Sequence, residues 1–285
     1  MVKYIAELGS NWKSAIDNTG ILRAKGLISA AARAGCYGAK VQLFKAEELW
    51  HSSCQKEIEI NKERELPLEW IPKLYKHAHE QGIIFGASIF HERYVKEVNN
   101  YLDFYKISSF DIRRESLIKA YLKTNKPLYI SLGLAYIDDI CILAEQIKNH
   151  PNKLVFMHCT SNYPTKLKDC NLKMIRLMKD SGAKGYEMGY SDHSSNQAAV
   201  LQAIFNGATT IECHFDYDTL DGVESSYGHC WTETKLAILI NLTKQMEIAE
   251  GTNSFLENRR KLVERNRKFL ADSIDGLRPA KEYRK

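Results

Sequence analysis

Short β-prone runs alternate with amphipathic helical runs along most of this chain. The expected strands are 3–7, 39–44, 83–88, 104–109, 128–131, 154–158, 186–190 and 210–214. The expected helices are 19–34, 68–81, 91–99, 114–124, 137–149, 171–181, 197–205 and 233–249. About eight β/α alternations in a row favour an α/β fold of the (β/α)8 TIM-barrel type over an open doubly wound sheet.

The composition is that of one large globular domain. The 285 residues are 44% hydrophobic and 26% charged, which is enough apolar material for a sizeable core. The net charge of +5 comes from the last 35 residues, where ten Lys and Arg stand against five Asp and Glu. We therefore expect a barrel domain, 1–250, a basic helix or tail, 251–285, and no nucleic-acid partner, because no basic patch lies outside the tail.

Seven scattered cysteines without CxxC spacing indicate a reduced compartment. The chain begins with strand-like residues instead of a signal peptide, so we expect a cytoplasmic protein. No apolar run approaches the roughly 18 residues that a membrane-spanning helix needs, and we expect no membrane partner. Neither a dinucleotide-binding Gly-rich motif nor a P-loop is present.

The segment 45–66 is polar and lacks a clear period. At this length we interpret it as an irregular functional loop. Basic residues in 56–64 are candidates for contact with a distal phosphate on a substrate.

Polar residues gather at or just beyond the ends of the expected strands. Because the carboxyl ends of barrel strands share one rim, we expect these side chains to face a single opening. They are Glu7, Lys40, Gln42, Ser88, Lys106, Ser109, Ser131, His158, Tyr163, Ser191, His193 and His214.

The residue types at this rim indicate a particular chemistry. His193 and His214 end two strand-like runs joined by an apolar helical run, and two imidazoles at a barrel mouth suit a divalent metal. Lys40 and Lys106, beside several serine hydroxyls, suit an anion with phosphate and carboxylate groups. A metal nearby polarises a carbonyl oxygen. The site therefore pairs an anionic small molecule with a carbonyl compound.

Four carboxylates are candidate acid–base groups. Glu7 ends the first strand, and the others follow the fourth, seventh and eighth strands: Asp111, Asp192 and Glu224. Each can exchange a proton with a substrate or contact a sugar hydroxyl.

Six segments carry a resemblance to a known family. They are Ile5-Ala6-Glu7-Leu8-Gly9-Ser10-Asn11, Lys40-Val41-Gln42-Leu43-Phe44, Lys106-Ile107-Ser108-Ser109, His158-Cys159-Thr160-Ser161-Asn162-Tyr163-Pro164, Gly189-Tyr190-Ser191-Asp192-His193-Ser194 and Ile211-Glu212-Cys213-His214-Phe215. The chain resembles the sialic-acid synthase family, NeuB-like barrel enzymes that condense phosphoenolpyruvate with an aldose. Their product is a nine-carbon 3-deoxy-2-keto sugar acid, and phosphate is released.

The resemblance implies roles for individual residues. His193 and His214 match ligands of a divalent metal, usually manganese, with magnesium as the alternative. Glu7 and Gln42 match residues near the sugar. In this analogy the metal holds the aldehyde while C3 of phosphoenolpyruvate attacks it, water adds to C2, and phosphate leaves by C–O cleavage. The residues that match the phosphoenolpyruvate pocket are Lys40, Lys106, Ser109, Ser131, Tyr163 and Ser191. Ser88, which stands in an altered motif, is a further substrate-binding candidate because its hydroxyl is expected beside the two lysines.

Several positions depart from the family pattern. Trp12 stands where the family has His, Asp111 where Glu is common, and Glu224 where a Gly-Pro-Asp motif has Asp. Family members usually continue into a small antifreeze-like domain, and we expect this chain to lack it, because too few residues follow the barrel. An acceptor other than N-acetylmannosamine is therefore an open alternative.

Other interpretations stay open. Lys40 and Lys106 could be salt-bridged core residues, and Glu7 could only close a barrel layer. We interpret the basic stretch 259–268 as a solvated helix face, and the alternative interpretation is a homodimer contact. The rival functions are a synthase for a phosphorylated or non-acylated aldose, a non-catalytic barrel that binds a sugar or a partner protein, and a metal-dependent hydrolase. The remaining histidines are expected to be ordinary core or surface groups: His51, His77, His79, His91, His150 and His229.

Overall fold

The computed structural model describes residues 1–251 except 15, 17–19, 149, 152 and 181–184. Its strands are β1 (Lys3–Glu7), β2 (Gly38–Leu43), β3 (Ile84–Ile89), β4 (Phe104–Ile107), β5 (Leu128–Ser131), β6 (Leu154–Cys159), β7 (Glu187–Asp192), β8 (Thr210–Asp216) and β9 (Trp231–Thr232). Its α-helices are α1 (Ile21–Ala34), α2 (Ala46–Leu49), α3 (Gln55–Lys62), α4 (Ile71–Glu80), α5 (Glu92–Val98), α6 (Glu115–Leu122), α7 (Ile137–Ile147), α8 (Lys173–Asp180), α9 (Gln197–Phe205) and α10 (Glu233–Glu250). Short 3-10 helices are η1 (Leu68–Trp70), η2 (Asn99–Tyr101), η3 (Leu167–Asp169) and η4 (Ser225–Tyr227).

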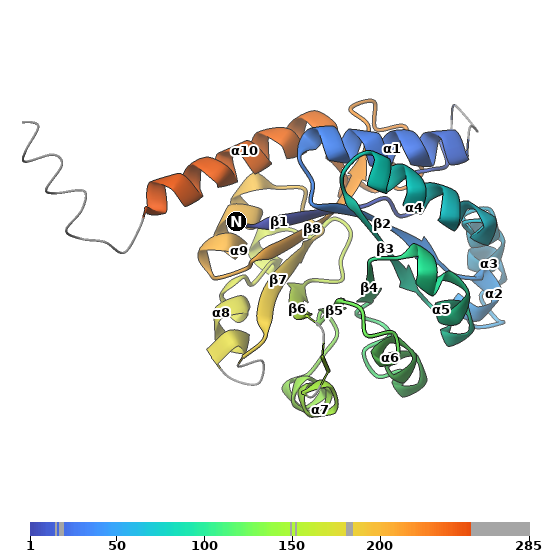
Figure 1. Cartoon of the computed structure of the whole chain (residues 1–285), viewed down its shortest axis with the longest axis horizontal. Helices are drawn as coiled ribbons and strands as arrows, with labels where there is room; N and C mark the ends of the chain where they lie inside the picture. The colour runs from blue at the N-terminus through green and yellow to red at the C-terminus, as the bar shows by residue number, and fades with distance from the viewer. Residues whose placement is uncertain (15, 17–19, 149, 152, 181–184, 252–285) are drawn as a thin grey trace, which may run out of the picture. The chain divides into compact units, whose positions relative to one another are not determined.

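The strands close into a ring. Each of β1 to β8 pairs in parallel with the next, and β8 pairs in parallel with β1. Helices α1 and α4 to α9 lie around the outside of this ring (Figure 1). The two-residue β9 extends the sheet beside the end of β8, with Phe215 opposite Trp231. The predicted (β/α)8 TIM barrel is confirmed.

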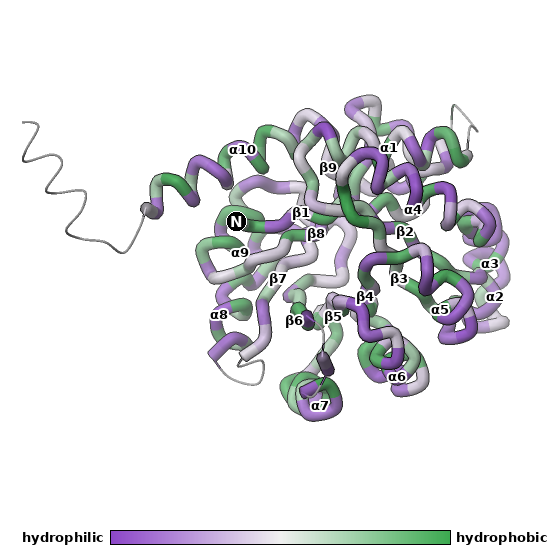
Figure 2. The backbone as a smooth tube through the Cα atoms, viewed as in Figure 1, coloured by the Kyte–Doolittle hydropathy of each residue, from purple (hydrophilic) through white to green (hydrophobic). Residues whose placement is uncertain are grey.

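The strands are buried on both faces, which is why they read as nearly continuous apolar runs. In β6, Val155 and Met157 face the inside of the ring, while Leu154 and Phe156 pack against the helices. The helices outside carry one apolar face and one polar face, visible as alternating green and purple turns in Figure 2. Full burial of each such side chain stabilises the fold by about 1.5–3 kcal/mol.

The ring interior has an apolar floor beneath a polar layer. The floor consists of Ile5, Phe104, Tyr129, Val155 and Met157. Residues two positions apart in a strand face the same side, so the next inward residues stand one layer higher. In three strands these residues are Glu7, Lys106 and Ser131. The fold thereby sets charged groups over a dry base, at the carboxyl ends of the strands.

The expectation of an irregular loop over 45–66 is wrong, because two helices, α2 and α3, occupy it. A salt bridge of 2.7 Å joins Lys62 of α3 to Glu47 of α2. In α3 only Ile58 is buried. A helix with one buried side chain leaves no apolar period in the sequence, which explains the error.

The chain divides into two compact units, Met1–Thr243 and Lys244–Lys285. Residues 244–250 complete α10, and the predicted basic tail and the 259–268 stretch lie outside the described residues apart from Gly251. The predicted domain boundary at residue 250 stays a prediction. Over the described part of the chain, no helix combines the length and the apolar character needed to cross a membrane.

Candidate active site

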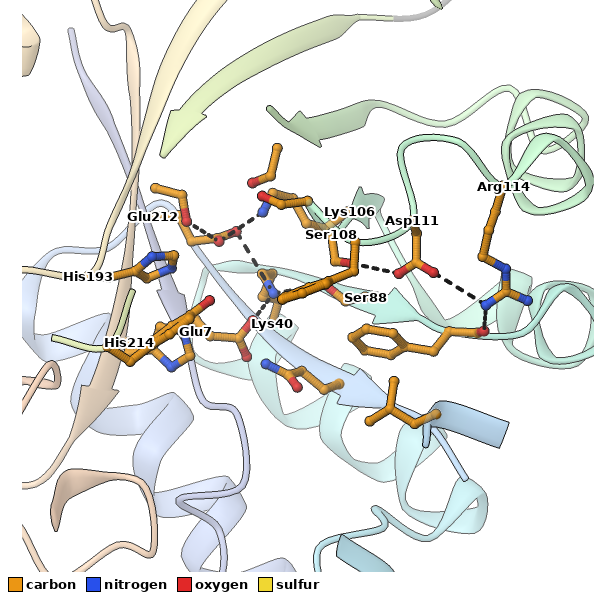
Figure 3. Close-up of a pocket in the computed structure, with 18 of the residues that line it drawn as sticks. Glu7, Lys40, Ser88, Lys106, Ser108, Asp111, Arg114, His193, Glu212 and His214 are labelled. Atoms are coloured by element: carbon orange, nitrogen blue, oxygen red, sulfur yellow. Dashed lines mark hydrogen bonds and ion pairs between the residues drawn. The ribbon is translucent and has the colours of Figure 1, made fainter. Parts of the chain in front are cut away.

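A cavity of ≈ 490 Å³ opens at the carboxyl ends of the strands. The predicted site residues that line it are Glu7, Lys40, Gln42, Ser88, Lys106, Ser109, Asp111, Ser131, Tyr163, Ser191, His193 and His214. Glu224 lines an adjoining cavity of ≈ 410 Å³, which shares Gln42, Tyr163 and His214 with the first. The structure thus brings all predicted site residues to one end of the barrel. Figure 3 shows residues that line the first cavity.

The centre of the cavity holds a buried network of alternating charges. Lys40 is ion-paired with Glu7, and its Nζ lies 3.0 Å from the Ser88 hydroxyl. Nζ of Lys106 donates to Oε1 of Glu212 over 2.9 Å, and Oε2 of Glu212 lies 3.8 Å from Lys40. Both lysines are therefore buried and ion-paired, as in the alternative that they are salt-bridged core residues. Both also face the cavity.

Burial changes the proton affinities in this network. Removal from water lowers the pKa of Lys40 to about 8, although Glu212 acts in the opposite direction. Burial alone would raise the pKa of Glu212, but Lys106 and Lys40 outweigh it and lower that pKa to about 2. The Glu212 carboxylate is therefore ionised at neutral pH.

Hydroxyl groups surround the two ammonium groups. Ser191 donates to Glu212 over 2.8 Å. The backbone N–H of Gly133 donates to the Ser109 hydroxyl over 3.1 Å, and that hydroxyl lies 3.0 Å from the Cys159 thiol. The Cys159 thiol therefore contacts a site residue. Hydroxyls and ammonium groups in this arrangement can hold a phosphate or a carboxylate by charge-assisted hydrogen bonds.

The two predicted metal ligands lie side by side, with ring centroids 5.5 Å apart. Nδ1 of His193 lies 2.8 Å from the Thr160 carbonyl, and Nδ1 of His214 lies 2.9 Å from Oε2 of Glu224. Because both partners accept, each Nδ1 carries a proton, and Nε2 is the nitrogen of each ring that can bind a metal ion. Burial, with His214 nearby, lowers the pKa of His193 to about 3, so this imidazole is neutral. Oriented imidazoles with a carboxylate behind one of them fit a divalent cation.

Glu224 reaches His214 because Gly9 leaves room for it. Gly9 has φ +48°, in the left-handed region, and a Cβ there would lie 2.3 Å from Oε2 of Glu224. The backbone N–H of Ser10 donates to Oε1 of Glu224 over 2.6 Å. Burial alone would raise the pKa of Glu224. The hydrogen bond and the charge interaction with His214, together with the hydrogen bond from Ser10, bring that pKa below its usual value.

Asp111 and Arg114 form the opposite side of the cavity, across Lys40 from His193 and His214 (Figure 3). Ser108 donates to Asp111 over 2.6 Å, and Nη1 of Arg114 lies 3.3 Å from the same carboxylate. Burial raises the pKa of Asp111 against the effect of these two partners. Its place across the cavity from the imidazoles favours a contact with the far part of a substrate over proton transfer beside them.

Glu212, Arg114 and His229 are among the residues of this site that were not predicted as site residues. Glu212 could have been found, because it stands two positions before His214 in a strand and must face the same side. Arg114 was taken only as a helix start. His229, taken as an ordinary histidine, lies in the same cavity as His214 and Glu224. No period marks the loop that carries it, so only the fold reveals its place.

His158 has a supporting place. Its Nε2 lies 2.8 Å from the Cys170 carbonyl, and it is not part of the cavity wall. Cys213 is buried in the layer between strands and helices, as expected of a small apolar group.

Comparison with known proteins decides the family. The NeuB family model matches residues 27–254. The protein belongs to the NeuB family. Pseudaminic acid synthase of Campylobacter jejuni is 28% identical to this NeuB-family chain, over 97% of it and 87% of the relative. The N,N′-diacetyllegionaminic acid synthase of the same organism is 30% identical, over 87% of this chain and 77% of the relative.

A solved structure agrees with this assignment. The N-acetylneuraminic acid synthetase of Leptospira borgpetersenii superposes on this NeuB-family chain with a TM-score of 0.83 and 25% identity. The match covers 93% of this chain and 91% of that one. The relatives are sugar-acid synthases, so the predicted family resemblance is confirmed and the chain is of an enzyme family.

Proposed function

We propose that this NeuB-family protein condenses phosphoenolpyruvate with an aldose to form a 3-deoxy-2-keto sugar acid and releases phosphate. One observation carries the proposal: two ammonium groups, Lys40 and Lys106, and two imidazoles, His193 and His214, face one cavity. We further expect small molecules, and neither nucleic acid nor membrane, as partners, and a cytoplasmic location.

Different residues of the chain would bind different parts of the reacting system. Lys40 and Lys106, with the serine hydroxyls, would hold the phosphate and carboxylate of phosphoenolpyruvate. His193 and His214 would hold a divalent cation, manganese with magnesium as the alternative, that polarises the aldehyde oxygen as a Lewis acid. The new bond joins C3 of phosphoenolpyruvate to the aldehyde carbon, and water adds at C2. Phosphate is then released when the bond between C2 and the bridging phosphate oxygen breaks.

Glu7 is the best-placed candidate for proton transfer. It lies opposite both Lys40 and His214 in the strand register, between the anion-binding and imidazole parts of the cavity. Its Oε1 accepts from the Gly9 N–H over 2.6 Å, which fixes the carboxylate. From this position it can take a proton from water or return one to the aldehyde oxygen.

Phosphate release tests the proposal. Purified protein is given phosphoenolpyruvate, Mn²⁺ and a panel of aldoses, which includes acylated amino sugars, simple aldoses and their phosphates. Release that needs the aldose, phosphoenolpyruvate and metal together supports it. Binding of phosphoenolpyruvate with no release across the panel contradicts it. Binding of neither phosphoenolpyruvate nor metal would support the non-catalytic alternative.

A phosphorylated aldose is the second candidate, and Arg64 favours it. Arg64 follows α3 and lines the adjoining cavity together with His214 and Tyr163. A guanidinium there could bind a distal phosphate through paired hydrogen bonds. Arg64→Gln should then raise KM for the sugar phosphate and leave KM for phosphoenolpyruvate unchanged; an unchanged KM for the sugar phosphate removes this candidate.

A further inference from the structure

His229 is a buried histidine whose side chain has no hydrogen-bond partner in the described part of the chain. The residue is 2% exposed, and neither ring nitrogen has a hydrogen-bond partner among the described residues. A neutral imidazole always has one donor and one acceptor nitrogen. Buried polar atoms are nearly always satisfied, so two unsatisfied nitrogens on one ring point to a missing partner.

The His229 ring lies close to other side chains that can bind a cation. Its centroid is 4.5 Å from that of His214, with an interplanar angle of 69°, and 5.1 Å from that of Tyr163. One ligand atom each from His214, Glu224 and His229 all lie within 4.8 Å of one another. Ligand atoms about 2 Å from a shared ion lie up to about 4 Å apart, so small side-chain rotations bring these groups into range.

The backbone around His229 is anchored on the barrel. Ser195 donates to the carbonyl of Cys230 over 3.0 Å. The indole N–H of Trp231 donates to Asp192 over 2.8 Å, and Trp231 belongs to β9, which pairs with β8. The ring is therefore presented to the site by a fixed segment.

We propose that His229 is a third imidazole at the cation site, in one ligand cluster with His214 and Glu224. This inference rests on the cation site of the proposed function and adds a ligand to it. Imidazole ligands favour ions such as Co²⁺ and Zn²⁺ over Mg²⁺, which prefers oxygen.

Cobalt binding to the full chain tests the proposal without any turnover. His229→Cys replaces the imidazole with a thiol that can still bind the ion. We expect Co²⁺ to give this variant a near-ultraviolet thiolate-to-cobalt charge-transfer band that wild-type protein lacks. Ser226→Cys is the matched control, because it places a thiol at an exposed position of the same loop and should give no band.

His229→Phe measures the contribution of the third ligand. Phenylalanine keeps a ring beside His214 but offers no lone pair, and we expect the Co²⁺ affinity to fall at least about tenfold. Thermal unfolding confirms that each variant is folded. No charge-transfer band in folded His229→Cys protein overturns the proposal, and so does a wild-type Co²⁺ affinity in His229→Phe. Phosphate release is not used in either measurement, so the proposed function and the third ligand succeed or fail separately.

Discussion

Nζ of Lys106 lies 2.9 Å from Oε1 of Glu212, although 106 positions separate them in the chain. The same oxygen accepts from Ser191, and the other carboxylate oxygen faces Lys40. One buried carboxylate therefore sets the positions of both ammonium groups. Because the charges balance before a substrate arrives, the network is held in place without one.

Glu212→Gln should destabilise the protein because it keeps the shape but removes the charge that compensates two buried lysines. We expect the free energy of unfolding to fall by about 3 kcal/mol, as when a buried ion pair loses one partner. Urea unfolding measures it. Glu115→Gln is the control, because its pair with Lys119 is exposed and should change stability by less than about 1 kcal/mol. Equal stabilities of the two variants would show that Glu212 is not needed to hold the lysines.

His214→Ala should abolish metal-dependent phosphate release and leave the fold intact. The substitution removes an imidazole of the proposed cation site and leaves Oε2 of Glu224 without its hydrogen-bond partner. Phosphate release and circular dichroism check the two parts of the prediction. Chelation of the metal should reproduce the loss in wild-type protein, and added Mn²⁺ should reverse it. Wild-type turnover in this variant would refute the site assignment.

Gly9→Ala should displace Glu224 from His214. The new Cβ would lie 2.3 Å from the carboxylate, and the left-handed backbone costs a further 1–2 kcal/mol or so. Gly82→Ala is the matched control, because Gly82 also has a positive φ but has nothing within 4 Å of an added Cβ. Both variants should lose stability in urea unfolding. Only Gly9→Ala should also lose cation affinity, and a similar affinity in both would contradict the role of Gly9.

The affinity for phosphoenolpyruvate should fall as pH rises above about 8. Burial lowers the pKa of Lys40 to about 8, so the ammonium is charged below that pH and neutral above it. A phosphate monoester is already dianionic above pH about 6 and cannot compensate. We expect Kd, measured without metal, to rise by up to about tenfold per pH unit above 8.

Arginine keeps its charge throughout this range. The Kd of the Lys40→Arg variant for phosphoenolpyruvate should therefore stay constant with pH, whether the variant binds more or less tightly than wild-type protein. The same titration affects stability. An unfolded lysine keeps its proton up to its ordinary pKa of 10.5, so the unfolded chain binds more protons between pH 8 and 10.5. Stability should therefore rise with pH over this window through Lys40. A wild-type Kd that stays constant from pH 7 to 10 would contradict the low pKa.

The alternation of apolar strands and amphipathic helices determined the barrel from the sequence alone, because burial on both strand faces is a local pattern. It also determined that Lys40, Lys106, His193 and His214 would share one rim, since parallel strands of a barrel end on the same side. Their chemical types and order carried the family resemblance, which the comparison confirmed.

Only the tertiary structure decided which of these groups touch. The contact of Glu212 with Lys106 depends on the register across several strands, and no local period records it. The place of His229 depends on how an aperiodic loop returns to the barrel, and the approach of Glu224 depends on a missing Cβ at Gly9. Such contacts join residues far apart in the chain, so their geometry is set by strand pairing and packing instead of by neighbouring residues.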